Sequence, residues 1–295
     1  MVNDAFTTSP LQPADQDGDT IGETRVLVMG FGALGAAALA QLAFRSEPGL
    51  KLLPAADTAQ IARDALSAES SPSPLLDGAH VLALLVDESD AAQTRMATAV
   101  AQASNRTVSL VMGVILSKPC DLDTLMQDIH ARRNSEDFAA SVRHVVRLEL
   151  HDDEGFPADA SAVLQTLTAD IACLCNKQHF CAVDFEDFMS VMSRPGPLAV
   201  NIGSASGPER ANSAVSSVMA RTWPVSRSER LDCNVMLIVS SSSTTFRFSE
   251  AMLVINAVRL RLGSDQHLIF AGVQSDEMGD RLQVALLVTP NERNE

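Results

Sequence analysis

Two runs of apolar residues set the strongest limit on how this chain folds. Val81–Val86 (VLALLV) and Val108–Leu116 carry no charged side chain, and both are far shorter than the roughly 20 residues that span a bilayer. Helical patterns separate these runs from each other and from the shorter run Arg25–Met29. Strands that are apolar throughout and alternate with helices predict a parallel sheet with helices on both faces.

The second half of the chain has a different pattern. In the first half, strands are expected at Arg25–Met29, Lys51–Pro54, Val81–Val86, Thr107–Leu116 and His144–Leu150, and helices at Ala33–Phe44, Thr58–Ser67, Ser89–Ser104 and from Asp121 to Arg133. In the second half, helices are expected at Ala158–Lys177, Asp184–Ser193, Pro208–Arg221 and Ser249–Leu262, and strands at Leu198–Gly203, Asn234–Ser240, His267–Val273 and Leu282–Thr289. The second half therefore predicts an α+β domain of about four strands with two helices on one side.

Charge and cysteine content exclude several classes of protein. Lys and Arg number 22 and Asp and Glu number 37, a net charge of −15, which argues against a main role in binding nucleic acid or an anionic membrane. Five cysteines at irregular spacing, without the pattern of a signal peptide, fit reduced thiols and a cytoplasmic location. The polar segment Met1–Glu23 contains acids and no base, and we expect it to be a disordered tail.

A glycine motif follows the first expected strand. Gly30, Gly32 and Gly35 form G-x-G-x-x-G where that strand leads into a helix, a pattern that lets backbone amides approach a phosphate. Asp57 follows the next extended segment, where an acid would bind a ribose in a dinucleotide site. The alternative is that these glycines only permit tight packing of the helix on the strand, because single matches to this motif are common.

Two further patterns have simpler explanations than a catalytic site. Cys173, Cys175, His179 and Cys181 resemble metal ligands, but residues two apart in a helix face away from each other, so we expect buried thiols and no metal. Gly203–Gly207 resembles the turn that carries a nucleophilic serine, but its central residue is alanine, which excludes that chemistry.

The acids of Asp184–Asp187 lie just after the long expected helix. Asp184 is a good N-cap for the next helix, and the other acids complement its dipole. A tight group of carboxylates can also orient and polarise a water molecule. Both readings remain open from the residues alone.

In their order and spacing, these segments resemble FtsZ, the bacterial homologue of tubulin. The matching segments are Ala182–Phe188, similar to the family's N-x-D-x-x-D loop; Ser206–Ala211, similar to S-G-x-x-R-A; Ser249–Arg259; Leu268–Met278; Gly30–Gly35; Gly78-Ala79; and Lys118-Pro119. The resemblance implies a Rossmann-like parallel-sheet GTPase-type domain, joined by a long central helix to a smaller α+β domain. The domains implied are a tail at 1–23, a nucleotide-binding domain at 24–157, the central helix at 158–180 and a C-terminal domain at 181–295.

The chain departs from the family where GTP phosphates would bind. The family has the glycine loop G-G-G-T-G-T-G after the central strand, but here Val86–Gln93 has no glycine and contains Asp87, Glu88 and Asp90. Like charges at about 4–6 Å repel by about 1 kcal/mol each in water and by more when partly buried. Ser161 or Ala162 stands where the family contacts guanine, and neither can pair with both of its N–H groups. We therefore expect weak or absent GTP binding.

The acids of the second half follow the family more closely. The resemblance implies that Asp184 and Asp187 reach the nucleotide pocket of a neighbouring subunit and help position the attacking water. Ala182 replaces the motif's asparagine, so one polar contact is missing. The chain would then keep the face that completes a neighbour's site while lacking a working site of its own.

These observations predict an FtsZ-like protein that does not hydrolyse GTP by itself. It would associate with itself or with FtsZ along a filament axis, as a filament component, cap or modulator in cell division, without nucleic acid and without inserting into a membrane. The sequence stops at Glu295, and on that basis we expect no direct tethering through the tail by which the family reaches membrane anchors. Three alternatives remain: a working GTPase in which Mg²⁺ bridges GTP or GDP to the acids, a dinucleotide-binding protein that uses Gly30–Gly35, and an interaction protein without a ligand.

Overall fold

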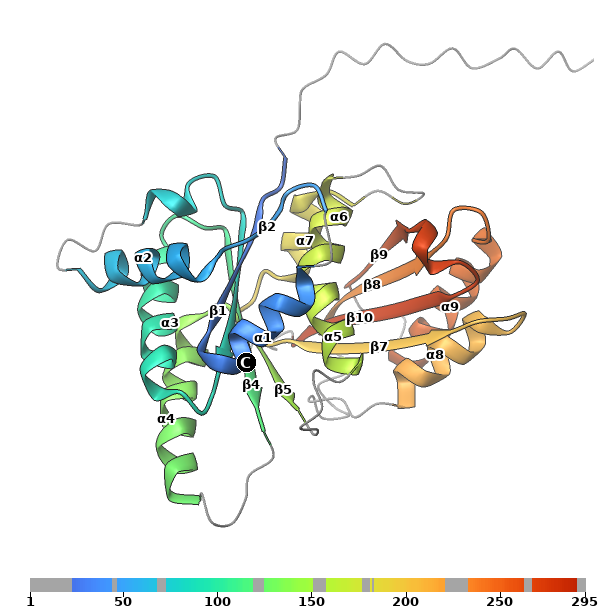
Figure 1. The fold of residues 1–295 in the computed structure, drawn as a ribbon. Helices are drawn as coiled ribbons and strands as arrows, with labels where there is room; N and C mark the ends of the chain where they lie inside the picture. Colours follow the sequence, from blue (N-terminus) through green and yellow to red (C-terminus); the bar gives the residue numbers. More distant parts are fainter. Residues whose placement is uncertain are drawn as a thin grey trace, which may run out of the picture.

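A computed structural model describes most of the chain and contains two sheets on either side of a helical segment (Figure 1). The residues described are 23–43, 47–67, 73–118, 125–150, 158–176, 181, 183–220, 233–262 and 267–290. The expected tail at residues 1–22 therefore lies outside the described residues, as do Cys120, Asp121, Lys177, His179 and Ala182. In the part of the chain that is described, no helix has both the length and the apolar character needed to cross a membrane.

The first sheet is parallel, as the apolar runs predict. Its order is β2-β1-β3-β4-β5-β6. The strands are β1 (Val26–Phe31), β2 (Leu50–Leu52), β3 (Val81–Asp87), β4 (Leu110–Ser117), β5 (His144–Glu149) and β6 (Gly196–Pro197). Every residue of β3 is buried, which explains why this central strand has no alternation of polar and apolar residues.

Helices cover both faces of this sheet (Figure 1). They are α1 (Gly32–Leu42), α2 (Ala55–Leu66), a 3-10 turn (Pro74–Leu76), α3 (Ala91–Ser104) and α4 (Leu125–Ser141). Alternate residues of β1 point to opposite faces of the sheet. Val26 and Val28 pack on the side of α1, and Leu27 and Met29 pack on the side of α2, α3 and α4.

The end expected for α4 at Arg133 is wrong, because the helix continues to Ser141. The residues after Arg133 are mostly polar and show no helical periodicity of apolar side chains, yet Phe138 among them is fully buried. Its ring lies over Gly113 of β4, where a Cβ atom would come within 2.6 Å of Phe138 Cε1. The contact of Phe138 with the sheet is a tertiary interaction that the local pattern after Arg133 does not reveal.

A helical segment leads from the first sheet to the second. It consists of α5 (Ala158–Gln165), a π-helical turn (Thr166–Asp170) and α6 (Ile171–Asn176), with helical backbone at both junctions. The sequence predicted a regular helix here. The π turn coincides with buried hydroxyl groups: Thr166 Oγ1 donates to Asp170 Oδ2 at 2.9 Å, and Thr168 Oγ1 donates to the Leu164 carbonyl at 2.8 Å.

The second sheet has the predicted four strands and two helices on one side. Its order is β7-β10-β8-β9. The elements are α7 (Phe185–Val191), β7 (Ala199–Ala205), α8 (Arg210–Ala220), β8 (Cys233–Ser241), α9 (Phe248–Leu262), β9 (His267–Gln274), a 3-10 turn (Asp276–Met278) and β10 (Leu282–Pro290). Apolar side chains of α8 and α9, such as Val218 and Val254, pack on one face of this sheet.

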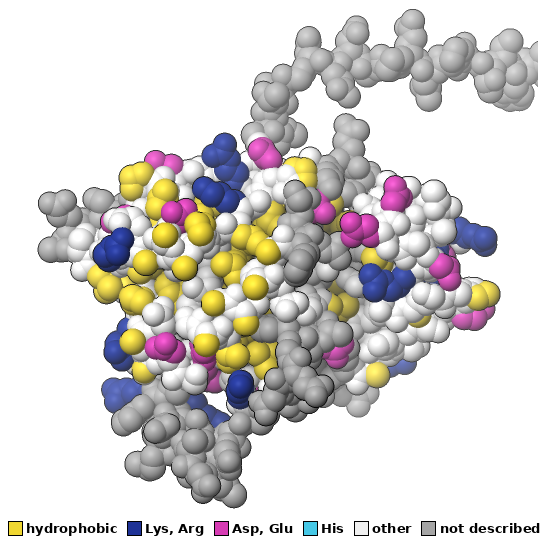
Figure 2. All heavy atoms as spheres, in the orientation of Figure 1, with side chains coloured by type: hydrophobic (Ala, Val, Ile, Leu, Met, Phe, Trp, Pro, Cys, Tyr) yellow, Lys and Arg dark blue, Asp and Glu magenta, His cyan; other side chains and the backbone are white. Residues whose placement is uncertain are grey.

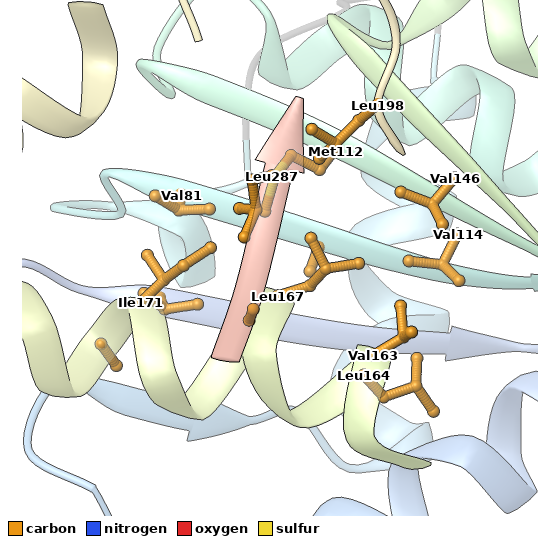
Figure 3. Close-up of a cluster of buried hydrophobic side chains, with 14 of the residues drawn as sticks. Val81, Met112, Val114, Val146, Val163, Leu164, Leu167, Ile171, Leu198 and Leu287 are labelled. Atoms are coloured by element: carbon orange, nitrogen blue, oxygen red, sulfur yellow. The ribbon is translucent and has the colours of Figure 1, made fainter. Parts of the chain in front are cut away.

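The main core joins the two sheets through the helical segment (Figure 3). Leu164, Leu167 and Ile171 belong to one buried cluster with Val114 of the first sheet and Leu287 of β10. Both sheets therefore pack on the same helix, and one continuous apolar core holds their positions relative to each other.

Candidate functional site

The glycine motif forms the turn between β1 and α1. A Cβ atom on Gly30 would lie 2.5 Å from the Gly35 carbonyl oxygen. A Cβ atom on Gly35 would meet the Leu85 carbonyl oxygen of β3 at well under 3.0 Å, which real Cβ atoms essentially never show. Gly32 has φ 76°, a left-handed conformation that favours glycine. Gly30 and Gly35 thus let α1 lie directly on β1 and β3.

The carboxylate of Asp87 lies against the N-terminus of α1. Asp87 ends β3 and is 4% exposed. Its Oδ2 accepts a hydrogen bond from the Leu34 amide at 3.1 Å, and its Oδ1 accepts from the Ser89 amide at 3.0 Å and from Ser89 Oγ at 2.6 Å. This carboxylate therefore occupies the position, in front of a helix N-terminus, that a phosphate takes in glycine-loop sites.

The other two acids of this loop also have partners within the chain. Glu88 Oε1 accepts from Ser135 Oγ at 2.6 Å and forms an ion pair with Arg147 at 3.3 Å. Asp90 caps α3, because its Oδ1 accepts from the amides of Ala92 and Gln93 at 3.1 and 3.0 Å. The three carboxylates point to different elements, which separates charges that the sequence places side by side.

Sequence reasoning identified the charge of this loop but not the contact of Asp87 with α1. The signal that could have revealed it is an acid at the end of a buried strand, which brings it to the same sheet edge as the G-x-G turn. Asp57 lies in the first turn of α2, and Ser161 and Ala162 lie on α5.

Helix α7, which follows Asp184 and contains Asp187, lies at the end of the first sheet opposite to the Asp87 loop (Figure 1). The Phe185 ring of α7 packs edge-on against His80, with ring centroids 5.5 Å apart. His80 directly precedes β3, and Asp87 ends it. A strand of this length rises about 20 Å, so α7 and the Asp87 loop lie at opposite ends of the strand.

Asp184 and Asp187 are both exposed at the start of α7 but differ in their contacts. Asp184 is the N-cap, and its Oδ1 accepts from the Asp187 amide at 2.7 Å. The helix-capping role predicted for Asp184 is therefore present. The Asp187 carboxylate has no hydrogen-bond or ion-pair partner among the described residues.

The surroundings of the two cysteines near α7, Cys175 and Cys181, disfavour the thiolate form. Burial, with a smaller effect of the Asp184 charge, raises the pKa of Cys175 to about 12. Burial and the Asp187 charge also raise the pKa of Cys181. Within the described ranges, no group of three or more His, Cys, Asp or Glu side chains is arranged to hold a metal ion.

The S-G-x-x-R-A segment builds a polar network at one end of the second sheet. Gly207 has φ 89°, and its amide donates to Asp280 Oδ2 at 3.0 Å. Arg210 begins α8, is 3% exposed, and holds Glu250 of α9 through both carboxylate oxygens, at 2.7 and 2.8 Å. Arg210 therefore joins α8 to α9 and to the loop before β10. Gly203, at the start of the Gly203–Gly207 segment, packs closely against Val218 of α8.

Hydrophobic side chains gather around α1 on the face drawn in Figure 2. The helix contains no charged residue from Gly32 to Leu42. Helix α1 therefore has no basic side chain that could bind a polyphosphate. At its N-terminus, the Leu34 amide donates a hydrogen bond to the acid Asp87.

Comparisons with known proteins agree with this architecture. No family model matches the chain. The chain is 25% identical over 107 residues to the cell division protein FtsZ of Mycoplasmopsis pulmonis, a match that covers 36% of this chain and about a quarter, 27%, of that protein.

Solved structures match over much more of the chain. An empty FtsZ dimer from M. jannaschii has a TM-score of 0.73 at 17% identity, covering 91% of this chain and 88% of that one. CetZ2 from Haloferax volcanii, a GTPγS-bound protofilament, has a TM-score of 0.62 at 14% identity, covering 92% and 95%. TubZ of Bacillus thuringiensis serovar israelensis has a TM-score of 0.59 at 11% identity, covering 92% and 86%. The chain therefore has the FtsZ/tubulin fold, and its sequence resembles that family.

Proposed function

We propose that this chain is an FtsZ/tubulin-like protein that associates along a filament axis and does not hydrolyse GTP by itself. One observation carries the proposal: the acids at the two ends of the first sheet differ in whether their carboxylates have partners within the chain. At one end, Asp87 and Asp90 occupy the helix N-termini that would bind phosphate. At the other end, the Asp187 side chain is exposed, and its carboxylate has no hydrogen-bond or ion-pair partner among the described residues.

The proposed loss of GTP hydrolysis follows from the negative charge of the loop after β3. A polyphosphate beside Asp87, Glu88 and Asp90 would meet like charges at short range, each repelling it by about 1 kcal/mol in water and by more where water is excluded. A helix N-terminus attracts an anion by about 0.3–1 kcal/mol, and this attraction is already used by the chain's own carboxylates. The nucleotide site would therefore be empty in the working protein.

The proposed role along a filament depends on Asp184 and Asp187, at the α7 end of the first sheet. Asp184 and Asp187 would reach a neighbouring subunit's nucleotide, with Asp187 helping to orient the attacking water. The solved relatives described as a dimer and as a protofilament support association between subunits of this fold. We propose a cytoplasmic filament component, cap or modulator whose partner is a second copy or an FtsZ subunit.

The test replaces Asp187 by alanine and measures the effect of the chain on GTP turnover and sedimentation of FtsZ. We expect wild-type protein to change turnover, and Asp187→Ala to lose most of that effect, since removal of a group that orients water costs on the order of 10²-fold. Its amide, which Asp184 holds, is untouched by the substitution.

Glu186 supplies the matched control. It is an exposed acid on the same turn of α7, so Glu186→Ala removes the same charge from the same surface. We expect it to keep the effect on turnover. Equal behaviour of the two variants would contradict a specific role for Asp187.

A further inference from the structure

His144 is a buried histidine that contacts the segment between α7 and β6. It begins β5 and is 1% exposed. Its Nε2 atom lies 3.1 Å from the Met192 carbonyl oxygen, just after α7, and its Nδ1 atom lies 3.3 Å from the Gly196 carbonyl oxygen in β6. Both ring nitrogens therefore face carbonyl oxygens of the segment that leads out of α7.

Two other side chains bind the carbonyl groups on either side of Met192. Thr289 Oγ1 of β10 donates to the Val191 carbonyl at 2.8 Å, and Arg143 Nη1 donates to the Ser193 carbonyl at 2.8 Å. The carbonyl groups at a helix end lack partners within the helix, so donors from other elements have to supply them. Here the donors come from both sheets and meet at the C-terminal end of α7.

Helix α7 depends on such contacts for its position. It has seven residues, and a helix this short is not stable on its own in water. Asp187 lies in its first turn, and the Asp187 amide donates to the Asp184 carboxylate. The position of the Asp187 carboxylate relative to the first sheet is therefore set by the contacts of α7 with the rest of the chain, those at its C-terminal end included.

The surroundings of His144 favour a neutral ring. Burial is the largest effect on its pKa and lowers it, and the charge of Arg143 lowers it further, against the opposing effect of the two carbonyl groups. The neighbouring strands β4, β6 and β10 contain no ionisable side chain, Arg194 lies in the segment between α7 and β6, and the acids of α7 lie in its first turn. A neutral imidazole carries one N–H, so it can donate to only one of the two carbonyl groups, and the Met192 carbonyl is the nearer.

We propose that His144 is a positioning residue, which fixes α7 and with it Asp187 by donating from Nε2 to the Met192 carbonyl. Strand β6 does not need the ring, because the Gly196 amide donates to the Arg143 carbonyl at 2.8 Å. The proposal rests on the proposed function for the role of Asp187, whereas the bond from His144 to Met192 can be tested without it.

The test compares His144→Gln with His144→Asn. A glutamine amide nitrogen reaches about as far from the backbone as Nε2 and can donate to Met192, whereas an asparagine amide nitrogen reaches about as far as Nδ1 and can donate only to Gly196. Hydrogen exchange is followed at the Phe188 and Met192 amides, which bond to the Asp184 and Phe188 carbonyls. We expect exchange about tenfold faster than wild type in His144→Asn and within about twofold in His144→Gln, because only glutamine keeps the bond to the end of α7.

The second readout is the effect of the chain on GTP turnover by FtsZ. We expect His144→Gln to keep this effect and His144→Asn to lose most of it, as Asp187→Ala does. His267 supplies the control, because it is an exposed histidine at the start of β9, and His267→Asn removes an imidazole from a different element. We expect that variant to behave as wild type in both measurements.

Two exchange results overturn the proposal: equal rates in the two His144 variants, and a faster rate in His144→Gln than in His144→Asn. If either variant does not fold, nitrogen-15 NMR of the wild-type imidazole at mildly alkaline pH, where the ring is neutral, decides. A proton on Nε2 supports the proposal, and a proton on Nδ1 overturns it.

The positioning role and the proposed function can fail separately. If the wild-type chain does not change FtsZ turnover, the proposed function fails, and exchange of the α7 amides still decides whether His144 holds α7. If exchange follows the prediction but both His144 variants keep the full effect on turnover, the link from His144 to Asp187 is wrong and the proposed function stands.

Discussion

Replacing Arg210 with alanine is expected to lower the free energy of unfolding by about 3–5 kcal/mol, the range for breaking a buried ion pair. The guanidinium donates five hydrogen bonds, to both oxygens of Glu250, to the hydroxyl and carbonyl of Thr245, and to the carbonyl of Asp280. Its removal leaves the Glu250 carboxylate without its main partner in a largely buried setting. Chemical denaturation at neutral pH measures the loss.

The same substitution has a predictable pH dependence. Hydrogen bonds from Arg210 are the largest cause that lowers the pKa of Glu250 below its ordinary value of 4.5. A folded-state pKa below the unfolded value adds stability that is present above pH 4.5 and is lost as the pH falls through the folded-state pKa. We therefore expect the difference between wild type and Arg210→Ala to be largest near neutral pH and to shrink in acid.

Arg259 supplies the control for Arg210. It is an exposed arginine in the last turn of α9, so Arg259→Ala removes the same charge from the same pair of helices. We expect it to change the free energy of unfolding by no more than about 0.5 kcal/mol. A loss of similar size in both variants would show that net charge, and not the buried network, decides stability.

Gly35→Ala is expected to destabilise the protein by about 3 kcal/mol without any ligand present. The added Cβ atom meets the Leu85 carbonyl, a backbone atom in the centre of the first sheet, so α1 has to move away from β3. Forcing extra atoms into packed structure costs about 1–3 kcal/mol and at times more. Thermal or chemical unfolding of the nucleotide-free protein measures this cost.

Gly207→Ala is the matched substitution in open space. Gly207 has φ 89°, and no atom lies within 4 Å of an added Cβ. Only the left-handed backbone penalty of about 1–2 kcal/mol then applies. If Gly35→Ala costs no more than Gly207→Ala, close packing does not explain the glycine motif, and a phosphate-binding role for Gly30, Gly32 and Gly35 becomes the better explanation.

Much of the fold follows from local patterns in the sequence. The apolar run at Val81–Val86 predicts a strand buried on both faces, and β3 is such a strand. The two-residue strand β6 could not be predicted, because Gly196 and Pro197 have no periodicity and form a strand only by pairing with His144 and Val145. The end of α4 likewise depends on the tertiary contact of Phe138 with Gly113.

In the candidate site, too, local features could be predicted from the sequence and tertiary contacts could not. Asp184 as an N-cap is a local feature, read from an acid followed by a helical pattern, and the structure contains that cap. The contact between Asp87 and Leu34 joins residues 53 apart in the sequence. It depends on β1 and β3 being neighbours in the sheet, so the sequence revealed three crowded acids but not that each has its own partner.

Calorimetric titration of GTP and GDP, with Mg²⁺, into purified protein stripped of nucleotide decides whether this chain has a working nucleotide site. We expect no binding heat up to millimolar nucleotide, because the carboxylates of Asp87 and Asp90 accept hydrogen bonds from the N-termini of α1 and α3, where phosphate would bind. Micromolar binding would contradict this expectation. A divergent working GTPase, with Mg²⁺ bridging the phosphates to these acids, would then be the better description of the protein.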